Sequence, residues 1–319
     1  MRFASLLLAA AVACATPASA ETWPTKPVKI VVPFTPGSAT DIVARAVTER
    51  LTPALGQPVI VENRPGAGGT IGAAAVAASP PDGYTLLVHS SGHAANPALF
   101  AHLSYDTIND FAGITALANL PNVLIVAPDK GIKNVAELIA LAKSRPGEIN
   151  FASAGIGSAT HINAEKFRAR AGFEAVHVPY RGTPEALTDT MTGRIDFFFA
   201  PLVAAFPFIK EGKVLALAVG TSTRSPLLPD VPTTVESGVP DSQYDFWIGL
   251  LAPAKTPREI IDRLYHETSK ALASTELRDR LTALGATPMQ MTPQEFDAYV
   301  KKDVASVGEL VRAAGIKAN

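Results

Sequence analysis

Residues 28–51 read VKIVVPFTPGSATDIVARAVTERL, and this stretch decides the fold. The β-branched run at its start predicts a buried strand. The two prolines and Gly37 that follow predict a loop that ends the strand. Ser38 and Asp41 stand three residues apart, the spacing of a capping box, before apolar residues recur at helical period as far as Leu51. We therefore expect a strand, a tight loop and the start of a helix.

The first turn of such a helix can bind an anion. Its backbone N–H groups have no acceptor within the helix and carry the positive end of the dipole, so an anion is stabilised there without Lys or Arg. Residues 150–161, NFASAGIGSATH, repeat the order of strand, Gly/Ser loop and helix start, with Ser158 as the expected N-cap. Either pattern alone is more commonly an ordinary βα unit. Together they favour two anion-receptive helix starts in one chain.

Strands and helices alternate along the rest of the chain, which predicts right-handed βαβ crossovers and parallel sheets. Capping signals mark helix starts at Asn134, Thr256 and Thr292, and the amphipathic C-terminal helices are expected to pack back on the first domain. Residues 207–212 are expected to form a short connecting segment. Further strands are expected at 58–62, 85–88, 123–127, 175–179, 195–200, 214–219 and 244–253.

Length, composition and charge indicate an exported globular protein of two domains. The chain has 319 residues, which is more than a single hydrophobic core usually serves, and 47% of them are hydrophobic. The formal net charge is −1 and the charged residues are scattered, so no basic stripe points to nucleic acid. After the N-terminal region, no run is long and apolar enough to span a membrane.

The N-terminus has the pattern of a secretory signal peptide over residues 1–20. A positive start is followed by an apolar segment and by the small-residue site Ala18-Ser19-Ala20, so we expect cleavage before Glu21. The alternative is lipid attachment at Cys14. If cleavage follows Ala20, the mature chain has no cysteine, which excludes disulfides, metal thiolate sites and cysteine nucleophiles.

The motifs of enzymes and metal sites are missing from the sequence. The glycines of residues 66–72 do not have the spacing of a dinucleotide fingerprint. His89 and His93 flank Ser-Ser-Gly at a strand end with no third ligand, so we expect pocket lining or a solvated loop and no metal. His161 is expected to pack, since no carboxylate stands at an obvious pairing offset. No Gly-x-Ser-x-Gly elbow and no Ser-x-x-Lys dyad is present.

Several motifs together resemble the Bug (TctC-like) family, the substrate-binding receptors of tripartite tricarboxylate transporters. They run in family order across nearly the whole chain after the signal segment. They are residues 23–30, 33–37 with Asp41 and Arg45, 62–69, 81–87, 178–182, 193–196, and 247–253 with Pro257. Ser38 departs from the family pattern, which often has a second glycine there. Its hydroxyl would stiffen the first loop or add a polar group to the pocket.

The resemblance implies a type II periplasmic-binding-protein architecture, an α/β fold of two domains that close like a Venus flytrap. Each domain is expected to have a central mixed, mostly parallel sheet. The first domain would comprise residues 21–124 and 244–319, and the second residues 125–243.

The resemblance also implies which residues bind ligand. In such receptors the loops after the first strands of each domain pinch a carboxylate through backbone N–H groups, hydroxyls and bridging waters. The first loop would contribute Phe34, Thr35, Pro36, Gly37, Ser38 and Thr40, with Asp41 ordering it. Opposite them would stand Ser153, Gly155, Gly157, Ser158 and Thr160. The variable end of the ligand would meet His89, Ser90, Ser91, Tyr180, Arg181 and Asp196.

The implied function is that of an extracytoplasmic solute receptor in the periplasm. It would bind a di- or tricarboxylate, an amino acid or an aromatic acid and deliver it to the membrane subunits of a tripartite tricarboxylate transporter. We expect a monomer without cofactor, metal or nucleic acid. Two alternatives stay open: a ligand-binding co-receptor for a membrane sensor kinase, and an exported hydrolase.

Overall fold

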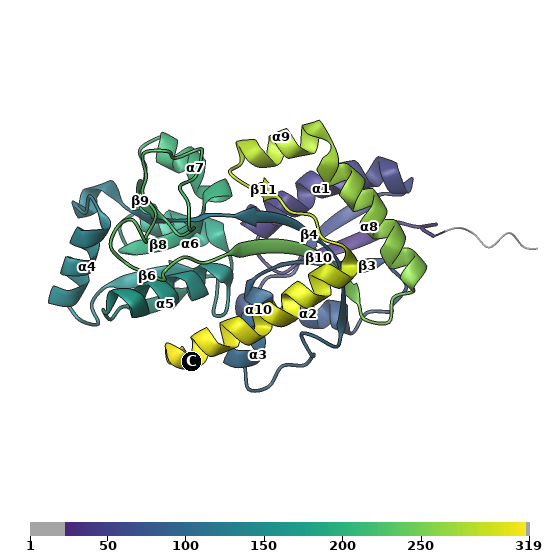
Figure 1. The fold of residues 1–319 in the computed structure, drawn as a ribbon, viewed down its shortest axis with the longest axis horizontal. Helices are drawn as coiled ribbons and strands as arrows, with labels where there is room; N and C mark the ends of the chain where they lie inside the picture. Colours follow the sequence, from purple (N-terminus) through teal and green to yellow (C-terminus); the bar gives the residue numbers. More distant parts are fainter. Residues whose placement is uncertain (1–22, 317–319) are drawn as a thin grey trace, which may run out of the picture.

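The computed structural model describes residues 23–316, which form two α/β lobes, each built on one sheet (Figure 1). The expected signal peptide, Cys14 and the cleavage site lie outside the described residues. The first lobe has a six-stranded sheet in the order β11-β4-β10-β3-β1-β2. Its strands are β1 (Val28–Val32), β2 (Val59–Asn63), β3 (Thr85–Ser90), β4 (Phe111–Leu120), β10 (Phe246–Pro253) and β11 (Thr287–Pro288).

The second lobe has a five-stranded sheet in the order β7-β6-β8-β5-β9. Its strands are β5 (Asn122–Val126), β6 (Asn150–Ser153), β7 (Val176–Pro179), β8 (Phe197–Pro201) and β9 (Leu215–Val219). Both sheets are mixed, as predicted, but they are not mostly parallel. Parallel pairs join β2-β1-β3 and β7-β6-β8, whereas β4, β5, β9, β10 and β11 pair antiparallel. The return strands between the lobes cause this difference.

Helices cover both faces of each sheet. The first lobe has α1 (Ala39–Leu55), α2 (Thr70–Ala77), α3 (Gly92–Leu99), α8 (Arg258–Ala273), α9 (Thr275–Ala283), α10 (Pro293–Ala313) and the 3₁₀ turn η1 (Ala67–Gly69). The second has α4 (Val135–Ser144), α5 (Ala159–Ala171), α6 (Thr183–Met191), α7 (Leu202–Lys210) and η2 (Pro128–Lys130). Both α8 and α10 contact β4, so the C-terminal helices pack back on the first lobe as their amphipathic spacing predicted. Within residues 23–316, no helix combines the length and apolar character that a membrane crossing requires.

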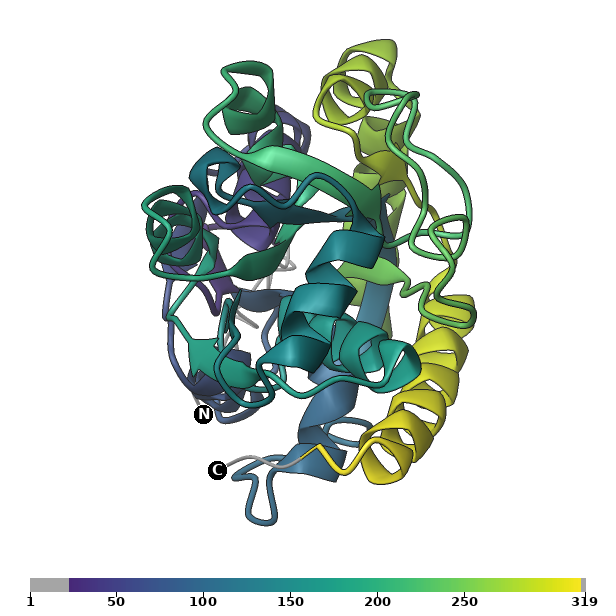
Figure 2. The ribbon, with the colours of Figure 1, turned by 90° about the vertical axis from the view of Figure 1, so that its left-hand side faces the viewer.

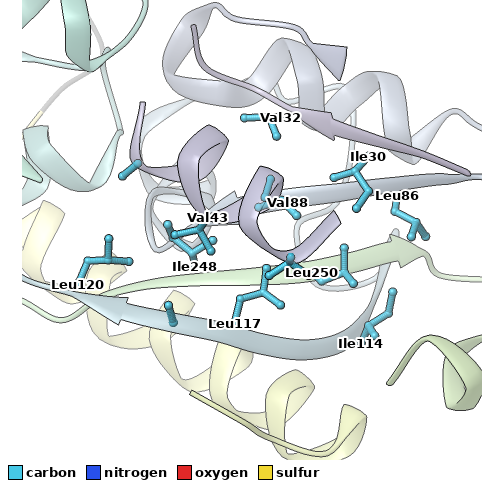
Figure 3. Packing of buried hydrophobic residues seen from close by; sticks show 14 of the residues in the cluster. Ile30, Val32, Val43, Leu86, Val88, Ile114, Leu117, Leu120, Ile248 and Leu250 are labelled. Atoms are coloured by element: carbon cyan, nitrogen blue, oxygen red, sulfur yellow. The ribbon is translucent and has the colours of Figure 1, made fainter. Parts of the chain in front are cut away.

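The core of the first lobe follows from the two-residue period of its strands. Alternate side chains of β1 point to opposite faces, so Ile30 packs on the α1 face and Val31 on the face covered by α2 and α10. Figure 3 shows Ile30 beside Leu86 of β3, and Val88 nearer Val43 of α1 with Leu250 of β10 beneath it. These side chains are almost fully buried, which holds the loop after β1 on a rigid base.

Two extended connections cross between the lobes. The chain passes from β4 to β5 through Pro121, and it returns through the segment that ends at Tyr244. The Gly220 N–H donates to the Asn122 carbonyl at 2.8 Å, and the Tyr244 N–H donates to the Gly220 carbonyl, also at 2.8 Å. The two connections therefore lie side by side. Figure 2, viewed from the side of the second lobe, shows its teal and green elements in front of the first.

Local capping signals were mostly confirmed. Asn134, Ser158 and Thr292 each accept a backbone N–H at the start of their helices, and Thr292 forms a full capping box. The prediction at Thr256 was wrong, because α8 has Pro257 at its N-cap. The capping box of Ser38 and Asp41 is also absent, although Ser38 does stand at the N-cap of α1.

The elements that were missed include α3, β4 and α7. Gly92 and His93, which were expected in a loop, begin α3, where His93 is fully buried. The strand β4 has no clear alternation, because nearly all its side chains are buried and its sequence, FAGITALANL, reads ambiguously. The helix α7 includes Pro207, where a connecting segment was predicted. Pro207 stands in the last part of this helix, whose earlier residues pack against the second sheet.

Candidate functional site

A small cavity lies where the loops after β1 and β6 meet. Its lining comes from both lobes. The first lobe contributes Phe34, Ser38, Ala39, Thr40, Ser90 and Phe246, and the second contributes Ala154, Ser158, Ala159, Thr160, Thr183 and Pro201. None of these side chains is charged, and half of them carry a hydroxyl group. An anion in this cavity would depend on backbone dipoles and hydroxyls.

Two helices begin at this cavity with the same tetrapeptide, Gly-Ser-Ala-Thr. It occupies residues 37–40 before and in α1, and residues 157–160 before and in α5. The glycines have φ values of +83° and +82°, and Ser38 and Ser158 have φ near −65° with ψ of 158°. Both glycines are left-handed, a conformation that other residues adopt at a cost. The two helix starts therefore have the same backbone course.

The first-turn amides supply free donors. Among the residues that the structure describes, the N–H groups of Ala39, Thr40, Ala159 and Thr160 have no hydrogen-bond acceptor. This is the usual condition of a helix N-terminus, where the dipole also favours negative charge. All four residues line the cavity. The arrangement can therefore hold a small anion between the lobes without a cationic side chain.

The predicted glycines have a different role. The Gly37 amide donates to Asp41 Oδ2 at 2.9 Å, and the Gly155 amide donates to Ser153 Oγ at 3.0 Å. The Gly157 amide donates to His161 Nδ1 at 3.1 Å. These N–H groups are satisfied inside their own loops. The free donors therefore lie two or more residues further along, at the alanine and threonine of each helix start.

The Thr40 hydroxyl is unsatisfied at the cavity. Its residue is 2% exposed, and Oγ1 has no hydrogen-bond partner in the described part of the chain. The equivalent Thr160 Oγ1 instead accepts from the Ala154 amide at 2.9 Å and lies 3.0 Å from Ser158 Oγ. Buried hydroxyls without a partner are uncommon in native proteins. Thr40 therefore points to a polar group that binds in this cavity.

Asp41 holds the first loop in place. Its carboxylate accepts from the Gly37 amide, from Arg45 Nε at 3.0 Å and from Asn63 Nδ2 at 2.8 Å. The Asn63 amide also donates to the Phe34 carbonyl at 3.0 Å. Burial alone would raise the pKa of Asp41, but the hydrogen bonds from Arg45, Gly37 and Asn63 outweigh it and lower the pKa. The carboxylate stays ionised and orders the loop, as its predicted role requires.

Two stacked histidines support the second loop. The rings of His161 and His177 lie 3.9 Å apart between centroids at an interplanar angle of 18°. Ser153 Oγ accepts from the Gly155 amide and lies 2.6 Å from His177 Nε2, within hydrogen-bond distance. Burial lowers the pKa of His177 to about 4 and that of His161 well below its usual value. Both rings are neutral, and His161 Nδ1 is an acceptor. His161 packs as predicted, but the expectation that no carboxylate stands at a pairing offset was wrong, because Glu165 Oε1 lies 3.9 Å from His161 Nε2. His177 had no signal in the sequence.

The two lobes touch beside the cavity. Ser38 Oγ accepts from the Thr183 amide at 3.1 Å, and Thr35 Oγ1 donates to Glu185 Oε2 at 3.0 Å. A Cβ on Gly182 would lie 1.9 Å from Thr35 Oγ1 and 2.7 Å from Ser38 Oγ. Backbone approaches this close require a glycine. The structure therefore has the lobes closed.

A second glycine contact closes the other side of the loops. A Cβ on Gly68 would lie 1.7 Å from the Ile156 carbonyl oxygen. Gly68 lies in η1 of the first lobe, and Ile156 lies in the loop before α5. The glycine-rich segment of residues 66–69 thus lets the lobes approach, in addition to packing within its own lobe.

Of the predicted site residues, six line the cavity. They are Phe34, Ser38, Thr40, Ser158 and Thr160 from the two loops, and Ser90 joins them from the variable set. His89 points to the opposite face of β3, behind Phe34, with 5.7 Å between their ring centroids. Burial lowers the pKa of His89 to about 4, so its ring is neutral. Ser91 Oγ accepts from the Tyr244 hydroxyl at 3.2 Å.

The remaining candidates correct the prediction for the variable end. Tyr180 donates its hydroxyl to Asp189 Oδ2 at 2.7 Å, away from the cavity lining. Asp196 binds Lys130 Nζ at 2.7 Å and accepts from the Asn150 amide, at the edge of the sheet where β8 begins. The cavity lies at the other end of β8, at Pro201, so Asp196 is structural. Arg181 is exposed beside the closed loops and does not line the cavity.

Half of the residues that line the cavity were not predicted from the sequence. Ala39 and Ala159 could have been found, because each follows an N-cap serine. Thr183, Pro201 and Phe246 come from a helix start, a strand end and the return strand, and no local pattern marks them. Among residues 23–316, no group of three or more His, Cys, Asp or Glu side chains is placed to hold a metal ion.

Comparisons with known proteins agree with this geometry. The family model described as "Tripartite tricarboxylate transporter family receptor" (TctC) matches residues 43–316. Protein BugT of Bordetella pertussis is 36% identical over 305 residues, covering 95% of this chain and 94% of BugT. Two solved structures from Rhodopseudomonas palustris are similar. One, solved with adipate, has a TM-score of 0.89 at 35% identity, covering 92% of this chain and 98% of its own. The other, MatC with bound malate, has a TM-score of 0.87 at 36% identity, covering 91% and 100%.

Proposed function

The chain belongs to the tripartite tricarboxylate transporter receptor family, a family of periplasmic solute-binding receptors and not of enzymes, and on this premise we propose that its cavity captures a small carboxylate. The bound carboxylate would then pass to the membrane subunits of a tripartite tricarboxylate transporter. Relatives solved with adipate and malate support a carboxylate ligand.

One observation carries the proposal: two helix starts with free amides, and the unsatisfied Thr40 hydroxyl, line one cavity without a charged side chain. A carboxylate would accept from the amides of Ala39, Thr40, Ala159 and Thr160. Hydrogen bonds to a charged group contribute about 1.5–3 kcal/mol each, which suffices for tight binding of a small molecule. Bridging waters would extend these contacts at little cost.

Capture would occur by closure of the two lobes around the ligand. The two domains would be residues 21–121 with 244–319 and residues 122–243, because β5 pairs in the second sheet from Asn122 onward, three residues before the boundary expected from the sequence. They would rotate about the two crossing connections. A ligand favours closure only through contacts that the open state lacks. Amides from α1 and from α5 meet one carboxylate only when the lobes are together. The ligand therefore stabilises the closed form.

The proposed location is the periplasm, reached through the signal peptide of residues 1–20. Intact-mass spectrometry of the protein from the periplasmic fraction gives the mature N-terminus directly. A mass that begins at Glu21 supports export with cleavage at the predicted site. A mass with lipid on Cys14 would instead indicate membrane anchoring.

Binding is tested by calorimetry with a panel of dicarboxylates, amino acids and aromatic acids on ligand-stripped protein. We expect at least one ligand with micromolar or tighter affinity. Thr40→Val removes the free hydroxyl and keeps the shape of the side chain, so it should weaken that ligand about tenfold, or about 1.4 kcal/mol.

Thr48→Val is the matched control. Thr48 is also buried on α1, but its hydroxyl donates to the Arg45 carbonyl away from the cavity. Equal affinity in both variants would mean that the carboxylate does not contact Thr40. No binding across the panel by natively folded protein would contradict the proposed capture.

A further inference from the structure

We infer that the ligand of this cavity carries a single carboxylate on a small uncharged body. The inference rests on the proposed function, because it takes the interlobe cavity as the ligand site. It adds the class of carboxylate, which follows from counting the charges that face the cavity.

The cavity presents about one unit of positive charge. Each helix N-terminus is equivalent to roughly +0.5 of an elementary charge, and α1 and α5 both begin here. Two positive ends that face each other repel when nothing lies between them. One carboxylate offsets both, and it can accept from the free amides of the two helices at once. The charge balance is then complete.

No basic side chain lines the cavity to pair with a second carboxylate, and Arg181, beside the closed loops, is exposed and outside the lining. The twelve lining residues carry no Lys, Arg or His. Arg45 is bonded to Asp41 and Asn63 outside the cavity, and Arg64 is paired with Glu62. Behind Phe34, His89 is neutral. A second carboxylate in the cavity would therefore be desolvated without a partner, which is strongly unfavourable.

The walls favour an uncharged body. Phe34, Phe246 and Pro201 are buried and apolar, and they form the sides of the cavity between the two helix starts. The hydroxyls of Ser90 and Thr183 can bond a neutral polar group such as an amide or a hydroxyl. In the closed structure the space between these walls is small, so the carboxylate group itself would fill the part between the two helix starts.

Matched pairs that differ in one charge test the inference. Calorimetry compares succinate with succinamate, glutarate with glutaramate, and terephthalate with its monoamide. The members of each pair have the same size, and one carboxylate is replaced by an amide. We expect the monoamide to bind at least tenfold tighter in every pair that binds. This order would separate the chain from its relatives that were solved with the dicarboxylates adipate and malate.

The outcomes distinguish failure of the single-charge inference from failure of the proposed carboxylate capture. If the dicarboxylate of a pair binds as tightly as its monoamide or tighter, the single-charge inference is wrong and the proposed carboxylate capture stands. If none of the six compounds binds to natively folded protein, both fail. If the monoamide is preferred, Thr40→Val should weaken it about tenfold, which ties the preference to this cavity.

Discussion

Replacing Gly182 by alanine should hold the two lobes apart. Gly182 precedes α6 at the point where the second lobe meets the loop after β1. Its φ of −175° is extended, so an alanine has no backbone strain there. The added Cβ would instead lie 1.9 Å from Thr35 Oγ1 and 2.7 Å from Ser38 Oγ. Both atoms belong to the other lobe. Relief requires either rotation of the two hydroxyls, which breaks their hydrogen bonds across the cleft, or a partial opening of the cleft, and both weaken closure.

The cost can be worked from the contacts that opening breaks. The hydrogen bond from the Thr183 amide to Ser38 Oγ is buried and neutral, and contributes about 1 kcal/mol. The bond from Thr35 to Glu185 is charge-assisted but exposed, so it adds less than about 1 kcal/mol. Together they amount to about 2 kcal/mol. This is an upper bound, because Ser38 can recover part of it by capping α1 when the lobes open. The ratio of closed to open protein should therefore fall by up to about 30-fold, and the apparent Kd of a ligand that needs closure should rise by at most the same factor.

Small-angle X-ray scattering and calorimetry check this prediction. Gly182→Ala should have a larger radius of gyration with ligand present, a weaker affinity and an unchanged thermal midpoint. Gly308→Ala is the matched control, since its Cβ would meet only the Arg312 side chain at 3.4 Å or more within α10 and Ala98 at 3.9 Å. Adding Thr35→Ala to Gly182→Ala removes the shorter clash and should restore part of the affinity.

The reasoning is refuted if Gly182→Ala binds ligand with the affinity of the unchanged protein and scatters identically. The lobes would then close without these contacts, or they would close in another orientation. A large drop in the thermal midpoint would also count against it, because the predicted effect lies between the lobes and not within either core.

Two further predictions concern the groups behind the loops. Asp41→Asn leaves fewer acceptors for Arg45 and the Gly37 amide, so we expect the free energy of unfolding to fall by about 2 kcal/mol and the affinity to drop about tenfold. Urea unfolding measures the first effect and calorimetry the second. If neither changes, Asp41 does not hold the loop in place. The pKa values of His89 and His177 are lowered to about 4 in the folded protein, so the unfolded chain binds protons at a higher pH than the folded one. The stability that these histidines contribute is complete above pH 6.5 and declines as the pH falls to about 4. The free energy of unfolding should decrease by up to about 3 kcal/mol per histidine over this range. His177→Asn should reduce this decline in urea unfolding measured from pH 7.5 to 4, and an undiminished decline would assign it to other groups.

Local sequence predicted the parts of the site that are themselves local. The loop and helix start after β1, and the N-cap at Ser158, depend on residues within a few positions of each other. The closed lobes and the apolar walls depend on contacts between distant segments, such as Phe246 of β10 beside Ala154 after β6. No period or motif in the sequence carries that information.

Asp196 illustrates how a motif can mislead. A carboxylate at the beginning of a strand, in a segment that resembles the family pattern, was predicted to face the ligand. The cavity lies at the carboxyl ends of β6 and β8, whereas Asp196 stands at the start of β8 and binds Lys130. Strand direction decides the outcome, because the two ends of one strand lie on opposite edges of the sheet.

The two serines of the repeated tetrapeptide show why closure can respond to ligand. Ser158 Oγ accepts from the His161 amide and completes the start of α5 within one lobe. Ser38 Oγ instead accepts from Thr183 across the cleft, and the amides at the start of α1 are left without it. Opening the lobes would free Ser38 to cap α1, so closure exchanges one hydrogen bond for another. Its net gain is therefore small in the empty protein. The ligand supplies the acceptor that the first turn of α1 gives up, and this shifts the balance toward the closed form.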